Sequence, residues 1–167
     1  MDQVQILDFA MQMEKDGETF YRQCAAGTDD KGVAGILLRI ADSEVKHYEV
    51  LEQIKSDPEF LIPAEATVDK GVRNLFAEML DANTTFGGEK SELDLYQKAK
   101  GMEERSRAFY LDKAEAMTTE NARDLFQRIA DQEQKHVEFI ESIIEFVSRA
   151  EPGNWLENSE WFHAEEY

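Results

Sequence analysis

The sequence has little of what builds disulfide frameworks or interrupts helices. Cys24 is the one cysteine among 167 residues, which excludes an intramolecular disulfide and any cysteine cluster for zinc or an iron–sulfur centre. Only three prolines and nine glycines occur, so the composition permits long helices. No uninterrupted apolar run approaches the length of about 18 residues that marks a membrane-spanning helix, and we expect no membrane contact.

Basic residues are scarce relative to acidic ones. The chain has 18 lysines and arginines against 36 aspartates and glutamates, a formal net charge of -18. Because nucleic acids and anionic membrane surfaces are bound by basic faces, we expect neither as a partner. The first residues, MDQVQILDFAMQMEKD, lack the basic and apolar regions of a signal peptide, which predicts a cytoplasmic protein.

Apolar spacing predicts an all-α protein with four long helices. We expect these helices at about 2–26, 31–55, 91–117 and from just after 118–120 to about 150. The inward-facing stripe of the first helix is expected to be Ile6, Phe9, Ala10, Met13, Phe20 and Tyr21. A Thr-Asp-Asp segment after Gly27 offers an N-cap to the second helix, and Pro58 helps to end it.

The connections between the predicted helices define the topology. The first and second helices, like the third and fourth, are joined by a few residues, which forces antiparallel neighbours. A long segment over about 56–90, with a short extra helix expected at 69–82, separates the two pairs. Two antiparallel hairpins and one long crossover are the connectivity of ferritin-like four-helix bundles. We therefore expect one domain over 1–150.

An aromatic tail follows the predicted bundle over 151–167. It reads EPGNWLENSEWFHAEEY and contains Trp155 and Trp161. Aromatic side chains bury a large apolar area, so this tail is expected to pack either on its own bundle or on a second subunit. The expected assembly is a homodimer.

The chain repeats itself at an offset of 89 residues. The matched segments are 10–25 with 99–114, and 39–51 with 128–140. The first pair shares six identities, and the second pair, RIADSEVKHYEVL and RIADQEQKHVEFI, agrees at eight of 13 positions. A repeat of this kind indicates two copies of one supersecondary unit. Here the unit is a helical hairpin, and packing it on its own copy would give pseudo-two-fold symmetry.

Six candidate metal ligands occupy equivalent positions in the two halves. Glu44 and His47 are three residues apart and therefore share one helix face. Glu133 and His136 repeat this spacing, and single glutamates stand at matching places on the other two helices. The candidate ligands are Glu14, Glu44, His47, Glu103, Glu133 and His136.

The chemistry of a bundle core explains why these residue types belong together. Four buried carboxylates would repel one another and could not all ionise in an apolar core. Two divalent cations supply four positive charges, which balance four glutamates, while each histidine supplies a terminal ligand. A mixed oxygen and nitrogen site suits iron or manganese better than structural zinc.

One Glu-x-x-His pair is a weak signal, because surface helices are rich in glutamate. The combination of both Glu-x-x-His pairs with the two single glutamates is more specific, since two of the three histidines occupy equivalent repeat positions among apolar neighbours. The alternative is a bundle that retains the pattern without binding metal.

Tyr21 and Tyr110 each follow a candidate ligand by seven residues, on the same helix face. Each could donate a hydrogen bond to a ligand carboxylate on another helix and so orient that ligand. The alternative is that each tyrosine only fills the core near one end of the bundle.

These segments resemble the rubrerythrin branch of the ferritin-like di-iron carboxylate superfamily. The resemblance rests on MEKDGETFY around Glu14, MEERSRAFY around Glu103 and the two RIAD segments, and it covers about 1–150. It implies two iron ions, or manganese or a mixed pair, held by the six candidate ligands. The tail sequence WLENSEWF resembles that of small stand-alone members.

The resemblance also implies a function. It suggests a di-iron oxidoreductase that reacts with hydrogen peroxide or dioxygen, as a peroxidase or an oxidase that protects against oxidative stress. Rubrerythrins carry a four-cysteine rubredoxin-type module, and a single cysteine here implies a separate electron donor protein. Ser106 stands where the family has an additional glutamate. The alternatives are a ferroxidase or iron-sequestering protein, and a binding module that retains metal without turnover.

Overall fold

The structure, a computed structural model, describes residues 1–62 and 90–149. These residues form four helices and no strand, which confirms the predicted all-α class. The helices are α1 (Gln3–Gly27), α2 (Lys31–Ser56), α4 (Lys90–Ala114) and α5 (Glu120–Arg149). No helix in the described part of the chain has both the length and the apolar character needed to cross a membrane.

Side-chain caps fix where three of the helices begin. Asp2 and Gln5 form a capping box at the start of α1, in which each side chain accepts the backbone N–H of the other. Asp30 accepts the backbone N–H groups of Gly32 and Val33 at 2.8 and 2.9 Å at the start of α2. At the start of α5, the Thr119 hydroxyl accepts the backbone N–H of Ala122 at 3.2 Å. These caps satisfy N–H groups that have no partner within the helix.

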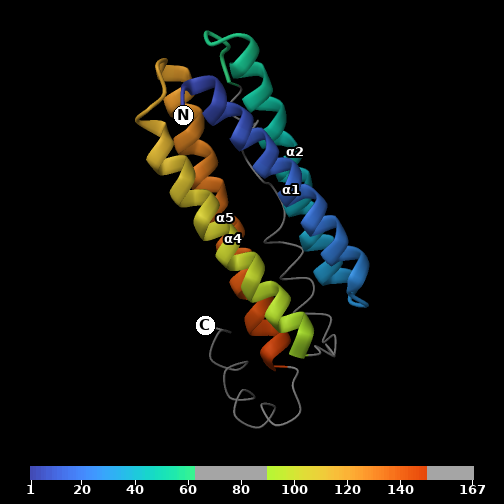
Figure 1. Ribbon diagram of the computed structural model, residues 1–167. Coiled ribbons are helices and arrows are strands. Elements are labelled where there is room, and N and C mark those ends of the chain that lie inside the picture. The colour runs from blue at the N-terminus through green and yellow to red at the C-terminus, as the bar shows by residue number, and fades with distance from the viewer. Residues whose placement is uncertain (63–89, 150–167) are drawn as a thin grey trace, which may run out of the picture.

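Two antiparallel hairpins build the bundle. α1 packs along α2, and α4 packs along α5, while α2 and α5 bring the two hairpins together (Figure 1). The turn of the α1–α2 hairpin and the turn of the α4–α5 hairpin lie at opposite ends of the bundle (Figure 1). The short loop within each hairpin therefore makes its two helices antiparallel neighbours, as the sequence predicted.

Two hydrogen bonds locate the ends of the long connection. Thr28, which follows α1, donates to Glu92 in the first turn of α4 at 2.9 Å. Asn121, at the start of α5, donates to the carbonyl of Phe60, which follows α2, at 3.2 Å. α2 therefore ends at the opposite end of the bundle from the start of α4, as a crossover requires. The helix expected at 69–82 and the aromatic tail at 151–167 lie outside the described residues.

The apolar core is divided into two clusters by a polar layer. One cluster lies at the end where α1 finishes and contains Tyr21, Ile36, Leu37, Ile40, Tyr96, Ile140 and Ile143. The other lies at the opposite end and contains Ile6, Leu7, Leu51, Ile54, Tyr110, Leu125 and Phe126. On every helix the candidate ligands stand between the members of the two clusters, so the core places them at the middle of the bundle.

The third predicted helix was expected to continue to about 117, but α4 ends at Ala114. The backbone N–H groups of Ala116 and Met117 donate to carbonyls three residues earlier, which makes a turn. The Met117 side chain is buried in the apolar cluster at this end. Burial of this side chain and the need to reverse direction before α5 therefore end the helix early.

Phe9 was expected in the inward-facing stripe of the first helix, and this prediction is wrong. Its side chain is 49% exposed at the edge of the bundle. The ring packs instead against Phe109 of α4, with 5.0 Å between ring centroids. Phe9 thus covers the boundary between α1 and α4 and does not fill the core.

Candidate metal centre

All six candidate ligands converge in the polar layer between the two apolar clusters. α1 contributes Glu14 and α4 contributes Glu103, while the Glu-x-x-His pairs come from α2 and α5. None of the six is more than 4% exposed. Burial of charged residues to this degree is rare unless they are paired or bind a metal, so the cluster requires an electrostatic explanation.

The ligand atoms fall into two overlapping groups. Within each group, one atom from every residue lies within 4.8 Å of the others. The groups are Glu14, Glu44, His47 and Glu133, and Glu44, Glu103, Glu133 and His136. Each group could hold a metal ion. Glu44 and Glu133 belong to both groups, whereas Glu14 and Glu103 belong to one group each.

Both imidazoles turn Nδ1 toward the carboxylates. His47 Nδ1 lies 3.2 Å from Glu14 Oε2 and 3.3 Å from Glu133 Oε1. His136 Nδ1 lies 3.4 Å from both Glu44 Oε1 and Glu103 Oε2. The two rings are stacked, with 5.8 Å between their centroids. The nitrogen that a metal would use is therefore the inward one in both histidines.

The two tyrosines connect the hairpins at the cluster. Tyr21 of α1 donates a hydrogen bond to Glu103 of α4, and Tyr110 of α4 donates to Glu14 of α1. Both side chains are buried. Burial and the neighbouring glutamates raise the pKa of each tyrosine well above its ordinary value, so each hydroxyl keeps the proton that it donates.

Two of the four carboxyl groups have raised pKa values because closely spaced buried carboxylates repel one another. Burial, followed by the charge of Glu44, raises the pKa of Glu14 to about 8. Burial, followed by the charges of Glu103 and Glu44, raises the pKa of Glu133 well above its ordinary value. Burial also opposes ionisation of Glu44, but the neighbouring Glu14 and the two histidines outweigh it and hold that pKa below its usual range.

Both histidines have raised pKa values despite their burial. Burial alone would lower the pKa of an imidazole, yet the pKa of His47 and that of His136 both lie well above the ordinary value. Glu14 is the main charge that raises the first, and Glu103 the main charge that raises the second. Protons on Glu14, Glu133 and the two histidines therefore supply positive charge that a bound cation can replace.

The donor set fits a metal on geometric grounds as well. Four buried atoms lack a hydrogen-bond partner among the described residues: Glu103 Oε2, Glu133 Oε1, His136 Nδ1 and His136 Nε2. Buried polar atoms without a partner are rare and unfavourable in folded proteins. Three of these four atoms face the cluster and are of the oxygen and nitrogen types that iron and manganese accept.

Two residues next to the ligands were not singled out from the sequence. The Ser43 hydroxyl lies 3.5 Å from His47 Nε2, on the outer side of that ring. A Cβ atom added to Gly17 would lie 3.5 Å from the carboxyl carbon of Glu44. The spacing in the sequence could have indicated both residues, because Ser43 precedes His47 by four residues and Gly17 follows Glu14 by three. Both positions face the same direction as the ligand on their helix.

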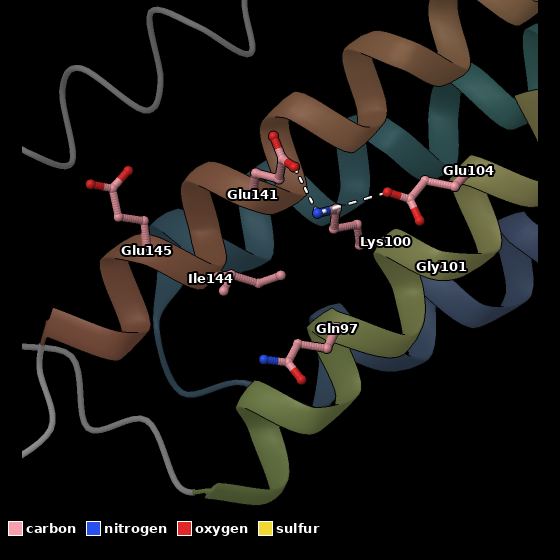
Figure 2. Close-up of a pocket in the computed structure, with 7 residues that line it drawn as sticks. All are labelled: Gln97, Lys100, Gly101, Glu104, Glu141, Ile144 and Glu145. Atoms are coloured by element: carbon pink, nitrogen blue, oxygen red, sulfur yellow. Dashed lines mark ion pairs between the residues drawn. The ribbon is translucent and has the colours of Figure 1, made fainter.

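A surface hollow of about 410 Å³ lies elsewhere, between α4 and α5 (Figure 2). Lys100 crosses it and forms ion pairs with Glu141 at 2.8 Å and with Glu104 at 3.7 Å. None of the residues that line this hollow belongs to the buried cluster. The hollow is therefore a separate feature of the outer surface, with its cation already paired.

The family model described as Rubrerythrin matches residues 5–144. The chain belongs to the rubrerythrin family. The matched range contains all six candidate ligands and both tyrosines, so the rubrerythrin match covers the whole cluster. Rubrerythrins typically bind iron, and the buried glutamates and histidines of this member have the composition of a metal site. No curated protein and no solved structure matched the chain significantly.

Proposed function

We propose that this rubrerythrin-family protein is a di-iron oxidoreductase that reduces hydrogen peroxide with electrons from a separate donor protein. The observation that carries the proposal is the pair of overlapping ligand groups, which share Glu44 and Glu133. Two shared carboxylates can join two ions, while a terminal glutamate and a histidine complete each position. This arrangement matches the ligand pattern of ferritin-like di-iron proteins.

Charge balance supports two divalent ions over one. Four ionised glutamates carry four negative charges, and two divalent ions neutralise them with both histidines uncharged. A single divalent ion would leave two buried charges to be balanced by protons, as the raised pKa values of Glu14 and Glu133 show for the metal-free cluster. The cluster therefore reaches neutrality without protons only when both positions are filled.

The residues of the chain prepare the site for a small oxidant. Tyr21 and Tyr110 hold the two terminal glutamates in place, which leaves the shared carboxylates free to join both positions. The apolar clusters on either side keep bulk water away from the centre. Two ferrous ions, when bound, supply the two electrons that convert one hydrogen peroxide and two protons into two water molecules. An external one-electron donor must then return two electrons.

Reconstitution with ferrous iron tests this function. The protein is loaded under argon, unbound iron is removed, and iron per chain is counted by a colorimetric chelator assay. We expect two irons per chain and, on rapid mixing, faster formation of the diferric absorption with peroxide than with dioxygen. Faster oxidation by dioxygen would favour the ferroxidase alternative, and failure to retain iron would contradict the metal site itself.

Neighbouring glutamates provide a matched control. Glu103 is buried in the cluster, whereas Glu104 lies on the exposed face of the same helix turn and pairs with Lys100. The Glu103→Gln variant should lose iron and the absorption change. The Glu104→Gln variant should keep both, because it alters the same helix turn without reaching the cluster.

A further inference from the structure

The sequence repeat gives the two metal positions the same ligand types, but their surroundings differ. We name them by their histidines: the His47 position has Glu14 as its terminal glutamate, and the His136 position has Glu103. Glu44 and Glu133 serve both. Any difference between the two positions must therefore come from the terminal ligands and the residues around them.

A continuous chain of hydrogen bonds closes the His47 position. Tyr110 donates to one oxygen of Glu14, and the other oxygen of Glu14 is 3.2 Å from His47 Nδ1. On the far side of the ring, His47 Nε2 lies 3.5 Å from the Ser43 hydroxyl. Both oxygens of the terminal glutamate and both nitrogens of the histidine therefore have partners within the protein.

The equivalent chain is interrupted at the His136 position. Tyr21 donates to one oxygen of Glu103, as the symmetry requires. Within residues 1–62 and 90–149, the other oxygen, Glu103 Oε2, has no hydrogen-bond partner, and neither nitrogen of His136 has one. His136 Nδ1 comes within 3.4 Å of Glu103 Oε2 but without the alignment of a hydrogen bond.

A difference in sequence accompanies this asymmetry. Ser43 precedes His47 by four residues, and the residue at the same place before His136 is Gln132. Both are buried. The two RIAD segments are identical on either side of this position, so the serine-to-glutamine difference stands between positions that match in the two halves. The amino-acid sequence therefore already makes the surroundings of the two histidines different.

The consequence concerns the order in which metal binds. A cation that enters the His136 position gives partners to Glu103 Oε2 and His136 Nδ1, which have no hydrogen bond to the part of the chain that the structure describes. A cation that enters the His47 position must first open the contact between Glu14 and His47. Buried polar atoms without partners are unfavourable, whereas breaking an existing bond offsets part of what coordination gains.

We propose that the two positions are inequivalent, and that the His136 position binds its metal first and more tightly than the His47 position. This inference rests on the proposed function, because it takes the cluster to bind two metal ions. It adds an order of loading, and it assigns that order to the hydrogen-bond chain that ends at Ser43.

A titration with Co²⁺ alone measures this order. Metal-free protein is titrated calorimetrically and by its visible cobalt absorption, without any oxidant or turnover. We expect two steps whose dissociation constants differ by about tenfold or more, where tenfold corresponds to about 1.4 kcal/mol. Two steps of equal affinity would overturn the proposal. Absence of any bound cobalt would instead contradict the proposed function.

Repeat-equivalent variants assign the steps. His136→Ala should remove the tighter step and keep the weaker one, and His47→Ala should do the reverse. Loss of the tighter step in His47→Ala alone would overturn the assignment. If either variant fails to fold, crystals of the unmodified protein with one equivalent of Co²⁺ decide the matter. The anomalous signal is expected next to His136, and a signal next to His47 or an equal signal at both would refute the proposal.

Discussion

Tyr110 on α4 donates its hydroxyl hydrogen bond to Glu14 on α1, so the two hairpins are joined at the buried cluster itself. Tyr21 makes the reciprocal bond to Glu103. The two contacts are one contact repeated, because each tyrosine and each glutamate is displaced by 89 residues from its counterpart. The same bonds that hold the hairpins together therefore also orient the terminal glutamates.

Replacing Tyr110 by phenylalanine should weaken both the fold and the site. The change leaves a buried oxygen of Glu14 without a donor, which costs about 1–3 kcal/mol of unfolding free energy. Residues that orient a ligand typically contribute about tenfold or more to metal affinity, and we expect a loss of that size. Urea denaturation and a metal titration measure the two effects.

Tyr96 provides the control for this variant. It is equally buried, but its hydroxyl donates to Glu92 at 2.6 Å, near the start of α4 and away from the ligands. Tyr96→Phe should destabilise the fold without changing metal affinity. If Tyr110→Phe bound metal as tightly as Tyr96→Phe, the orienting role of Tyr110 would be refuted.

Shared and terminal glutamates should differ in the number of metals lost. Glu133 belongs to both ligand groups and Glu14 to one. Glu14→Ala should therefore retain about one metal per chain, while Glu133→Ala should weaken both positions, because each loses a ligand. Elemental analysis after removal of unbound metal measures the stoichiometry. Equal stoichiometry in the two variants would argue against two ions that share carboxylates.

Gly17 should tolerate a methyl group but not a large side chain. A Cβ here would make an ordinary contact with Glu44 at 3.5 Å, and alanine within a helix stabilises by about 0.5–1 kcal/mol relative to glycine. Gly17→Ala should therefore unfold at a higher urea concentration. Gly17→Leu should push the Glu44 carboxylate from its place and reduce metal binding.

Gly101→Leu is the matched comparison for Gly17→Leu. Gly101 also lies inside a helix, but a Cβ there would meet only the Arg105 side chain, at 3.8 Å. This variant should bind metal normally. Normal metal binding in Gly17→Leu as well would show that the space beside Glu44 is not needed.

The metal-free protein should lose stability as pH rises. The folded pKa of Glu14, about 8, lies above its ordinary value of 4.5, so the folded state holds a proton that the unfolded state releases. Stability from this group is full below about 4.5 and declines until about pH 8. The raised pKa values of Glu133, His47 and His136 act in the same direction.

The lowered pKa of Glu44 has the opposite sign, but it acts at pH values below the ordinary value of 4.5. The urea midpoint of metal-free protein should therefore fall between about pH 5 and about pH 8. Bound metal should reverse this trend, because coordination requires deprotonated ligands and strengthens as pH rises. A metal-free protein that became more stable over this range would contradict the protonation pattern.

Much of the bundle could be predicted because its causes are local in the sequence. Helix periodicity, the Asp30 cap and the short hairpin loops depend on residues within one or two turns of each other. The end of α4 and the exposure of Phe9 were predicted wrongly, because both depend on packing against a distant helix. Phe9 has the apolar character of a core residue, but its ring lies against Phe109 at an edge.

The sequence by itself determined which residues make the cluster, since the 89-residue repeat and the three-residue Glu–His spacing put equivalent side chains on equivalent helix faces. Only the tertiary structure decided which atoms meet. The partners of Glu14, the shared places of Glu44 and Glu133 and the contact of Ser43 with His47 depend on distances between helices and on side-chain rotation. Those quantities follow from how two hairpins pack, and symmetry in the sequence therefore does not guarantee symmetry in the hydrogen bonds.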